Sequence, residues 1–213
     1  MKLIGITQRV EVFNDYRERR DCLDQRWAPL LTSLGYFPAP LANCVDDVEA
    51  YLASLRLSGV ILSGGNDICD VEGGSDVAAE RNRFEHRLLD LCSAAELPVL
   101  GVCRGAQMIC AHYGGQLAPI ENHVGKRHKV SLAPGIFSGW PEHIDGNSFH
   151  GYGISKLGEE QQIKAIAWAE DGSIEGIGHT ELHQFGIMWH PEREGVTAPH
   201  DLSMLSEIFG PGS

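Results

Sequence analysis

The chain has 213 residues, of which 43% are hydrophobic and 22% charged, and its formal net charge is −12 at pH 7. This length and composition are typical of one globular domain, residues 1–213, that buries a full core without disulfides or metal. The acidic balance disfavours nucleic acid or an anionic membrane as a partner, and without a signal peptide or long apolar span in the sequence we expect a cytoplasmic protein.

Apolar runs alternate with amphipathic segments from residue 2 to residue 112. The predicted elements are a strand at 2–7, a helix at 18–34, a strand at 37–41, a helix at 46–55, a strand at 57–62, a loop at 70–77, a helix at 80–96, a strand at 99–102 and a helix at 106–112. Strands that alternate with helices predict an α/β fold with a parallel sheet and right-handed crossovers. The ligand cleft is then expected at the carboxyl ends of the strands.

The remaining third of the chain has more strand character. Strands are predicted at 116–119, 128–132, 147–155, 163–169, 174–177 and 185–189, and a helix at 202–209. The six cysteines are scattered without a C-x-x-C pair, so the sequence indicates neither a zinc site nor a disulfide framework, and we expect no metal and no cofactor.

The predicted strand at 99–102 ends at a cysteine between two glycines. Gly101-x-Cys103-x-Gly105 is the thiol form of a nucleophile elbow, in which glycines allow the sharp turn that presents the middle side chain. The start of the next helix favours a thiolate at Cys103, and the backbone N–H of Arg104 is free to bind an oxyanion. The alternative is a buried cysteine in a tightly packed strand-helix junction.

A second motif, Trp189-His190-Pro191-Glu192, follows the predicted strand at 185–189. Pro191 keeps His190 extended, and residues two apart in an extended chain face the same side. Glu192 can therefore bind one imidazole nitrogen of His190 while the other faces a thiol. Nucleophile, base and orienting carboxylate together predict a Cys103–His190–Glu192 triad.

With these two motifs, an upstream Ser63-Gly64-Gly65 loop and an Asn147-Ser148-Phe149-His150 stretch, the sequence resembles the class I glutamine amidotransferase superfamily. The resemblance implies a flavodoxin-like fold, with a mostly parallel central sheet and helices on both faces. It implies that Cys103 attacks the δ-carbonyl of a γ-glutamyl group and forms a thioester, with the oxyanion between the N–H groups of Gly65 and Arg104. The residues that it places around the glutamyl group are Gly64, Gln107, Phe149, His150, Gly151 and Tyr152.

No synthetase domain is recognisable, so the sequence favours a free-standing γ-glutamyl hydrolase with a small-molecule substrate, and it is compatible with a homodimer. The segments 4–9 and 15–27 are similar to the γ-glutamyl-CDP-amidate hydrolases of capsule biosynthesis, which leave cytidine diphosphoramidate. An anionic leaving group would suit Arg9 at the end of the first strand. Two other functions stay open, a glutaminase subunit that supplies ammonia to a synthetase partner and a non-catalytic cysteine redox sensor.

Several charged residues have less specific interpretations. The arginines at 17, 19, 20 and 26 either extend an anion clamp or are solvated and paired with Glu18, Asp21 and Asp24. Arg81 and Glu85 are expected to form a solvated helix pair, with a place at the cleft rim as the alternative. His123 and His128 are expected in a surface loop, and the spacing of the histidines predicts no metal site.

Overall fold

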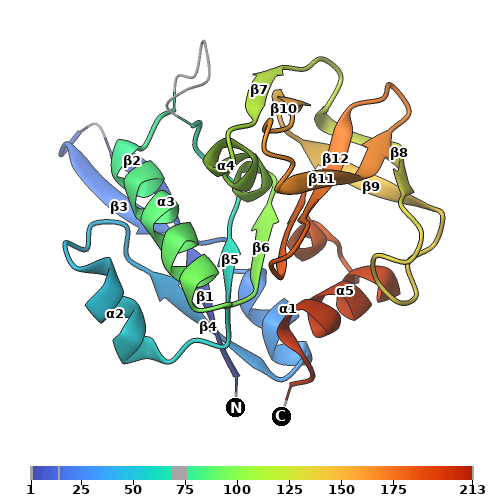
Figure 1. The fold of residues 1–213 in the computed structure, drawn as a ribbon. Helices are drawn as coiled ribbons and strands as arrows, with labels where there is room; N and C mark the ends of the chain where they lie inside the picture. The colour runs from blue at the N-terminus through green and yellow to red at the C-terminus, as the bar shows by residue number, and fades with distance from the viewer. Residues whose placement is uncertain (1, 14, 69–75, 213) are drawn as a thin grey trace.

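The computed structural model describes residues 2–13, 15–68 and 76–212. An 11-stranded sheet forms its centre, with the order β4-β1-β5-β6-β13-β12-β11-β8-β9 (Figure 1). The parallel part consists of β4 (Tyr36–Leu41), β1 (Lys2–Thr7), β5 (Gly59–Leu62), β6 (Val99–Val102) and β13 (Gln184–Ile187). The antiparallel part consists of β12 (Ile174–His179), β11 (Ile163–Ala169), β8 (Val124–Leu132) and β9 (His143–Phe149), with β10 (Tyr152–Lys156) and β7 (Gln116–Pro119) paired beside it.

Helices cover both faces of the sheet (Figure 1), as the resemblance implied. One face carries α1 (Trp27–Ser33) and α5 (Pro199–Phe209), and the other carries α2 (Val48–Leu55), α3 (Ala79–Ala94) and α4 (Arg104–His112). Each face of the sheet has its own hydrophobic core, and successive residues of a strand point to opposite faces. Ile61 therefore packs in the core on the side of α1 and α5, and Val60 and Leu62 pack in the core on the side of α2, α3 and α4. The buried strands therefore read as continuous apolar runs.

The register of β6 and β13 brings distant parts of the sequence together. The two strands are parallel and Val102 lies opposite Ile187, although β13 comes near the end of the chain. Cys103 N–H donates to the Ile187 carbonyl over 2.7 Å, which continues this pairing by one residue. The residues that follow β6 and β13 therefore leave the sheet at the same edge.

The helix predicted at 18–34 is wrong over its first part. Arg9–Phe13 (β2) and Glu18–Cys22 (β3) pair as an antiparallel hairpin, and the helix begins only at Trp27. Residues 18–21 are exposed charged side chains with no apolar face to bury, so a helix there gains nothing from packing. Strand pairing with β2 satisfies the backbone instead.

Two further differences concern the strands after residue 112. The strand predicted at 147–155 is two strands, because β9 ends at Phe149 and β10, after a turn at Gly151, pairs with β7. The strand predicted at 185–189 ends at Ile187, and a short 3-10 helix, η1 (Pro191–Arg193), follows. Residues 70–75 of the expected loop lie outside the described residues, and within the described ranges no helix is long and apolar enough to cross a membrane.

Candidate active site

Cys103 stands at the turn between β6 and the N-terminus of α4, with φ 53° and ψ −106°. Positive φ is strained for a side chain with a Cβ, and such strain is typical of functional sites. The flanking glycines are required by space, since a Cβ on Gly105 would overlap the Leu62 carbonyl and one on Gly101 would overlap the Gly105 backbone. The backbone thus has the shape of a nucleophile elbow.

His190 and Glu192 form a buried pair after β13. The His190 Nδ1 lies 2.7 Å from Glu192 Oε1, and both side chains are almost completely buried. A Cβ built on Gly64 would lie 2.9 Å from His190 Cε1 and 3.8 Å from Cys103 Cβ. The imidazole and the cysteine therefore meet beside Gly64, and Nε2, the ring nitrogen that does not face Glu192, adjoins the thiol.

The charges of this group favour an ion pair. Burial works against the thiolate, but the neighbouring His190 outweighs it and lowers the pKa of Cys103 below its ordinary value. Burial likewise disfavours the imidazolium, yet Cys103 and Glu192 raise the pKa of His190 to about 9. Both shifts favour a thiolate beside an imidazolium, the form in which a cysteine is nucleophilic.

Asn147 holds the backbone of His190, a role that the sequence analysis did not assign to it. Its Oδ1 accepts from His190 N–H over 2.8 Å, and its Nδ2 donates to the His190 carbonyl over 2.9 Å. This two-point contact ties β9 to the segment that follows β13. The only sequence signal was its place in the Asn147-Ser148-Phe149-His150 stretch.

The residues predicted around the glutamyl group gather on one side of Cys103. Gln107 Nε2 donates to the Tyr152 carbonyl over 2.8 Å, and His150 Nδ1 lies 3.0 Å from the same oxygen. The Phe149 ring lies edge-on to the His190 ring, with 5.8 Å between centroids. The β9–β10 turn around Gly151 therefore forms a wall next to α4.

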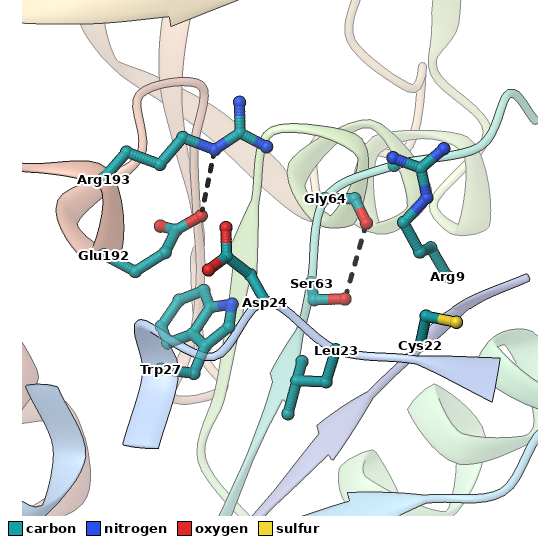
Figure 2. Close-up of a pocket in the computed structure, with 10 residues that line it drawn as sticks. Arg9, Cys22, Leu23, Asp24, Trp27, Ser63, Gly64, Glu192 and Arg193 are labelled. Atoms are coloured by element: carbon teal, nitrogen blue, oxygen red, sulfur yellow. Dashed lines mark hydrogen bonds and ion pairs between the residues drawn. The ribbon is translucent and has the colours of Figure 1, made fainter. Parts of the chain in front are cut away.

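A cleft of about 260 Å³ opens beside Gly64 (Figure 2). Its lining comes from four segments and comprises Arg9, Cys22, Leu23, Asp24, Trp27, Ser63, Gly64, Gly65, Glu192 and Arg193. Arg9 pairs with Glu11 at 2.7 Å and is 42% exposed, and the Arg193 guanidinium lies 4.7 Å from the centre of the Phe149 ring. Two arginines thus border the cleft, and Arg193 was not among the predicted site residues although it directly follows the His-Pro-Glu motif.

The N-terminal arginines do not extend this group. Arg20 pairs with Glu18, Arg26 pairs with Asp24, and Arg19 pairs with Glu80 on α3. All three lie on the exposed hairpin or at the start of α1, and none of them lines the cleft. The interpretation as solvated, paired side chains is confirmed for Arg20 and Arg26.

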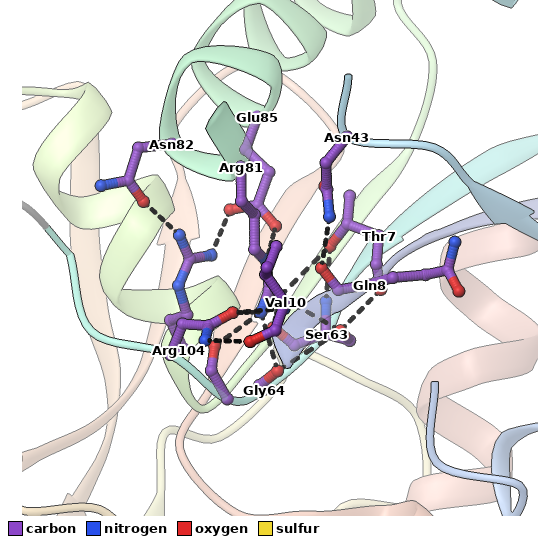
Figure 3. Close-up of polar contacts among 12 residues, drawn as sticks. Thr7, Gln8, Val10, Asn43, Ser63, Gly64, Arg81, Asn82, Glu85 and Arg104 are labelled. Carbon is purple, nitrogen blue, oxygen red and sulfur yellow. Dashed lines mark hydrogen bonds and ion pairs between the residues drawn. The ribbon is translucent and has the colours of Figure 1, made fainter. Parts of the chain in front are cut away.

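A buried ionic cluster joins α3 to the loop after β5 and to the start of α4 (Figure 3). Glu85 accepts from Arg81 Nε over 2.9 Å and from Arg104 Nη1, and Arg104 also donates to Asn82. Arg81 and Glu85 are completely buried, so the expected solvated helix pair is wrong. The reason is that α3 places Arg81 against the loop after β5, whose backbone carbonyls need donors.

Arg81 fixes the loop that follows β5. Its guanidinium donates to the carbonyls of Ser63 (2.6 Å), Gly64 (3.1 Å) and Gly65 (2.6 Å). In a trans peptide the C=O and the next N–H point in opposite directions. With the Gly64 carbonyl held by Arg81, the N–H of Gly65 therefore points away from the Arg81 guanidinium.

The histidines expected in a surface loop are not all exposed. His123 is 2% exposed and lies against Glu175 of β12, which is itself completely buried. The prediction of a surface position is wrong for His123, because the strands β8, β9 and β12 close over it. No motif around Glu175 in the sequence indicated that this side chain is buried or that it contacts His123.

Comparisons with known proteins agree with this architecture. The family model for peptidase C26 matches residues 2–192. The γ-glutamyl-CDP-amidate hydrolase of Campylobacter jejuni is 36% identical over 97% of this chain and 96% of its own length. A glutamine-hydrolysing GMP synthase subunit from Methanococcus maripaludis is 27% identical over 73% of this chain and 75% of its own length. A crystal structure from Thermoplasma acidophilum, provisionally described as a GMP synthase subunit, superposes with a TM-score of 0.74 over 99% of this chain and 93% of its own, at 23% identity, and shows the same fold.

The ion pair at Cys103 predicts a distinctive pH profile for alkylation by iodoacetamide. We expect the Cys103 rate to rise with a midpoint below pH 9, and the His190→Ala variant to shift that midpoint upward by about one unit or more because the stabilising charge is lost. Peptide mass spectrometry separates the cysteines, and Cys92 and Cys110, whose pKa burial raises to about 12, serve as internal controls. The same midpoint in both proteins would contradict the ion pair.

The buried cluster predicts a large stability effect for Glu85→Ala. Two arginines would lose their carboxylate in a buried site, so we expect the free energy of unfolding to fall by about 3–5 kcal/mol in a urea titration. The matched control is Asp90→Ala on the exposed side of the same helix, expected within about 0.5 kcal/mol of wild type. A loss no larger than that of the control would show that the cluster does not stabilise the fold.

Proposed function

The chain belongs to the peptidase C26 family, and from this premise we propose that it is a cysteine-dependent hydrolase that cleaves a γ-glutamyl C–N bond and releases L-glutamate. The observation that carries the proposal is the meeting of Cys103, His190 and Glu192 at one edge of the sheet, with a thiolate favoured at Cys103. An elbow cysteine, a buried base and an orienting carboxylate are the groups that acyl transfer requires.

In the first half of the reaction, the Cys103 thiolate attacks the δ-carbonyl carbon. The C=O electron pair moves onto oxygen, which the N–H groups of Gly65 and Arg104 stabilise. The oxyanion then collapses, the C–N bond breaks, and the imidazolium of His190 gives its proton to the departing nitrogen. The products are the free leaving group and a γ-glutamyl thioester on Cys103.

In the second half, neutral His190 takes a proton from water as the water oxygen attacks the thioester carbonyl. The C–S bond breaks, glutamate leaves, and the thiolate and imidazolium are restored. Glu192 keeps its hydrogen bond to Nδ1 throughout, so the proton is exchanged only at Nε2. Asn147 positions the imidazole by holding the backbone on both sides of it.

The glutamyl group is assigned to the wall formed by α4 and the β9–β10 turn. Its α-amino and α-carboxylate groups would contact Gln107 and the backbone of Phe149, Gly151 and Tyr152, with Gly64 leaving room beside the scissile bond. His150 shapes this wall through its contact with the Tyr152 carbonyl. Because Gln107 binds that same carbonyl, α4 is linked to the β9–β10 turn.

The leaving group is assigned to the cleft between Arg9 and Arg193, and γ-glutamyl-CDP-amidate is the proposed substrate. The Campylobacter jejuni hydrolase of that name supports this choice, since its similarity extends over nearly the whole of both chains. The cleft supports it too, because a guanidinium binds two phosphate oxygens at once. The product would be cytidine diphosphoramidate, which places the reaction in capsule biosynthesis.

A role as the glutaminase of a two-component synthetase is the second candidate function. The observation that favours it is the similarity to the GMP synthase subunit from Methanococcus maripaludis, over about three quarters of each chain. Such a protein would use the same triad and release ammonia for a synthetase partner. A redox sensor, by contrast, has no need of the buried His190–Glu192 pair.

Glutamate release by the purified chain separates these functions. We expect γ-glutamyl-CDP-amidate to be turned over at least about 100-fold more efficiently than L-glutamine or γ-glutamyl-γ-aminobutyrate, because only the first has a diphosphate for the cleft arginines. Cys103→Ala is the blank. Turnover of glutamine alone, or only after a synthetase is added, would favour the glutaminase role, and full activity of Cys103→Ala would exclude cysteine catalysis.

The assignment of the cleft predicts a selective effect of Arg9→Ala. The KM for γ-glutamyl-CDP-amidate should rise by about 10- to 100-fold, whereas the KM for an uncharged γ-glutamyl amide should stay within about twofold, since only the phosphate contact is lost. Steady-state assays on both substrates measure this. Arg20→Ala, on the exposed hairpin, is the control, and an equal loss on both substrates would mean that Arg9 only supports the Gly65 loop.

A further inference from the structure

A second cluster of buried ionisable side chains lies between β8, β9 and β12, apart from the triad. It consists of three histidines around one carboxylate, namely His123, His128, His150 and Glu175. Glu175 is completely buried, and His123 and His150 are 2% and 4% exposed. Buried charge of this kind needs either close hydrogen bonds or a bound ion.

The atoms that face one another in this cluster lack hydrogen bonds. His123 Nδ1, His128 Nε2, His150 Nε2 and both oxygens of Glu175 have no hydrogen-bond partner among the described residues. The distance to a carboxylate oxygen of Glu175 is 3.2 Å from His123 Nδ1, 3.6 Å from His128 Nε2 and 3.5 Å from His150 Nε2. Several buried polar atoms therefore converge on one place without satisfying one another.

The opposite ring nitrogens of two histidines do have partners. His123 Nε2 lies 3.0 Å from Asp171 Oδ2, and His150 Nδ1 lies 3.0 Å from the Tyr152 carbonyl. A carboxylate or carbonyl oxygen can only accept a hydrogen bond, so each of these nitrogens carries a proton, and the other nitrogen of each ring faces Glu175. Histidines that bind a metal are oriented by outer acceptors in this way.

We propose that His123 Nδ1, His128 Nε2 and the carboxylate of Glu175 bind one divalent transition-metal ion of the zinc type. The three donor atoms all lie within 4.8 Å of one another. Two ligands of a tetrahedral zinc ion, each about 2.0–2.1 Å from the metal, are about 3.3 Å apart. The separations from Glu175 Oε1 to His123 Nδ1 (3.2 Å) and from Glu175 Oε2 to His128 Nε2 (3.6 Å) are close to that edge. Imidazole with one carboxylate suits zinc rather than magnesium or calcium.

The ion would brace the pocket wall and take no part in the chemistry. It would hold Glu175, whose Oε1 faces His150, and His150 binds the Tyr152 carbonyl that also accepts from Gln107. An ion that binds only the folded chain also stabilises it. The site itself does not depend on the proposed function, because it requires only the three donor side chains.

The experiment measures zinc retention by the untagged full-length chain. The protein is dialysed against a chelator, reloaded with excess zinc chloride, passed through a desalting column and measured by mass spectrometry of the metal. We expect about one zinc per wild-type chain, and less than about a tenth of that for His128→Ala and for Glu175→Gln. The control is His143→Ala, an exposed histidine on the adjacent strand β9, which should retain zinc like wild type.

Thermal unfolding of the same samples tests the bracing role. Zinc should raise the unfolding temperature of wild type and His143→Ala but leave that of His128→Ala and Glu175→Gln unchanged, whatever their starting stability. Wild-type protein that retains no more zinc than His128→Ala would overturn the site. Retention of zinc without a rise in unfolding temperature would overturn the bracing role.

Discussion

The carboxylate of Glu85 pairs with two buried arginines, and the arrangement of the loops around Cys103 depends on that contact. Through Arg81 it reaches the three carbonyls of the Ser63–Gly65 loop, and through Arg104 it reaches the first turn after the elbow. Each of these buried cations needs a partner, and Glu85 serves both. The two backbone N–H groups proposed to bind the oxyanion belong to Gly65 and Arg104, so one side chain sets the relative position of both.

The sheet supplies the other half of the arrangement. Because β13 returns from the end of the chain to lie parallel to β6, the residues after these strands meet, and Cys103 comes next to His190. Asn147 links a third strand, β9, to this site, because its side chain binds the backbone of His190. The site therefore rests on strand ends and helices that packing holds in place, which is the kind of support that precise proton transfer requires.

The Phe149–Tyr152 segment contacts two groups of histidine and carboxylate, and the geometry of each group indicates a different role. In the His190–Glu192 pair, one nitrogen is bound at 2.7 Å and the other adjoins a thiol, which suits proton transfer. In the Glu175 cluster, the facing atoms stay 3.2–3.6 Å apart and two outer nitrogens are bound, which suits an ion.

The sequence alone predicted the α/β fold, the elbow around Cys103 and the pairing of His190 with Glu192, because each depends on local chain geometry. Glycines at 101 and 105 permit one sharp turn, and residues two apart in an extended segment share a side. It could not place Arg81 and Glu85 in the core, since an i,i+4 pair looks the same on a solvated helix and on a buried one. The burial of His123 against Glu175, the contact of Asn147 with His190 and the β2–β3 hairpin were likewise decided by tertiary structure. Each joins segments far apart in the chain or depends on a partner strand, and only packing determines which polar groups lose water and must find one another.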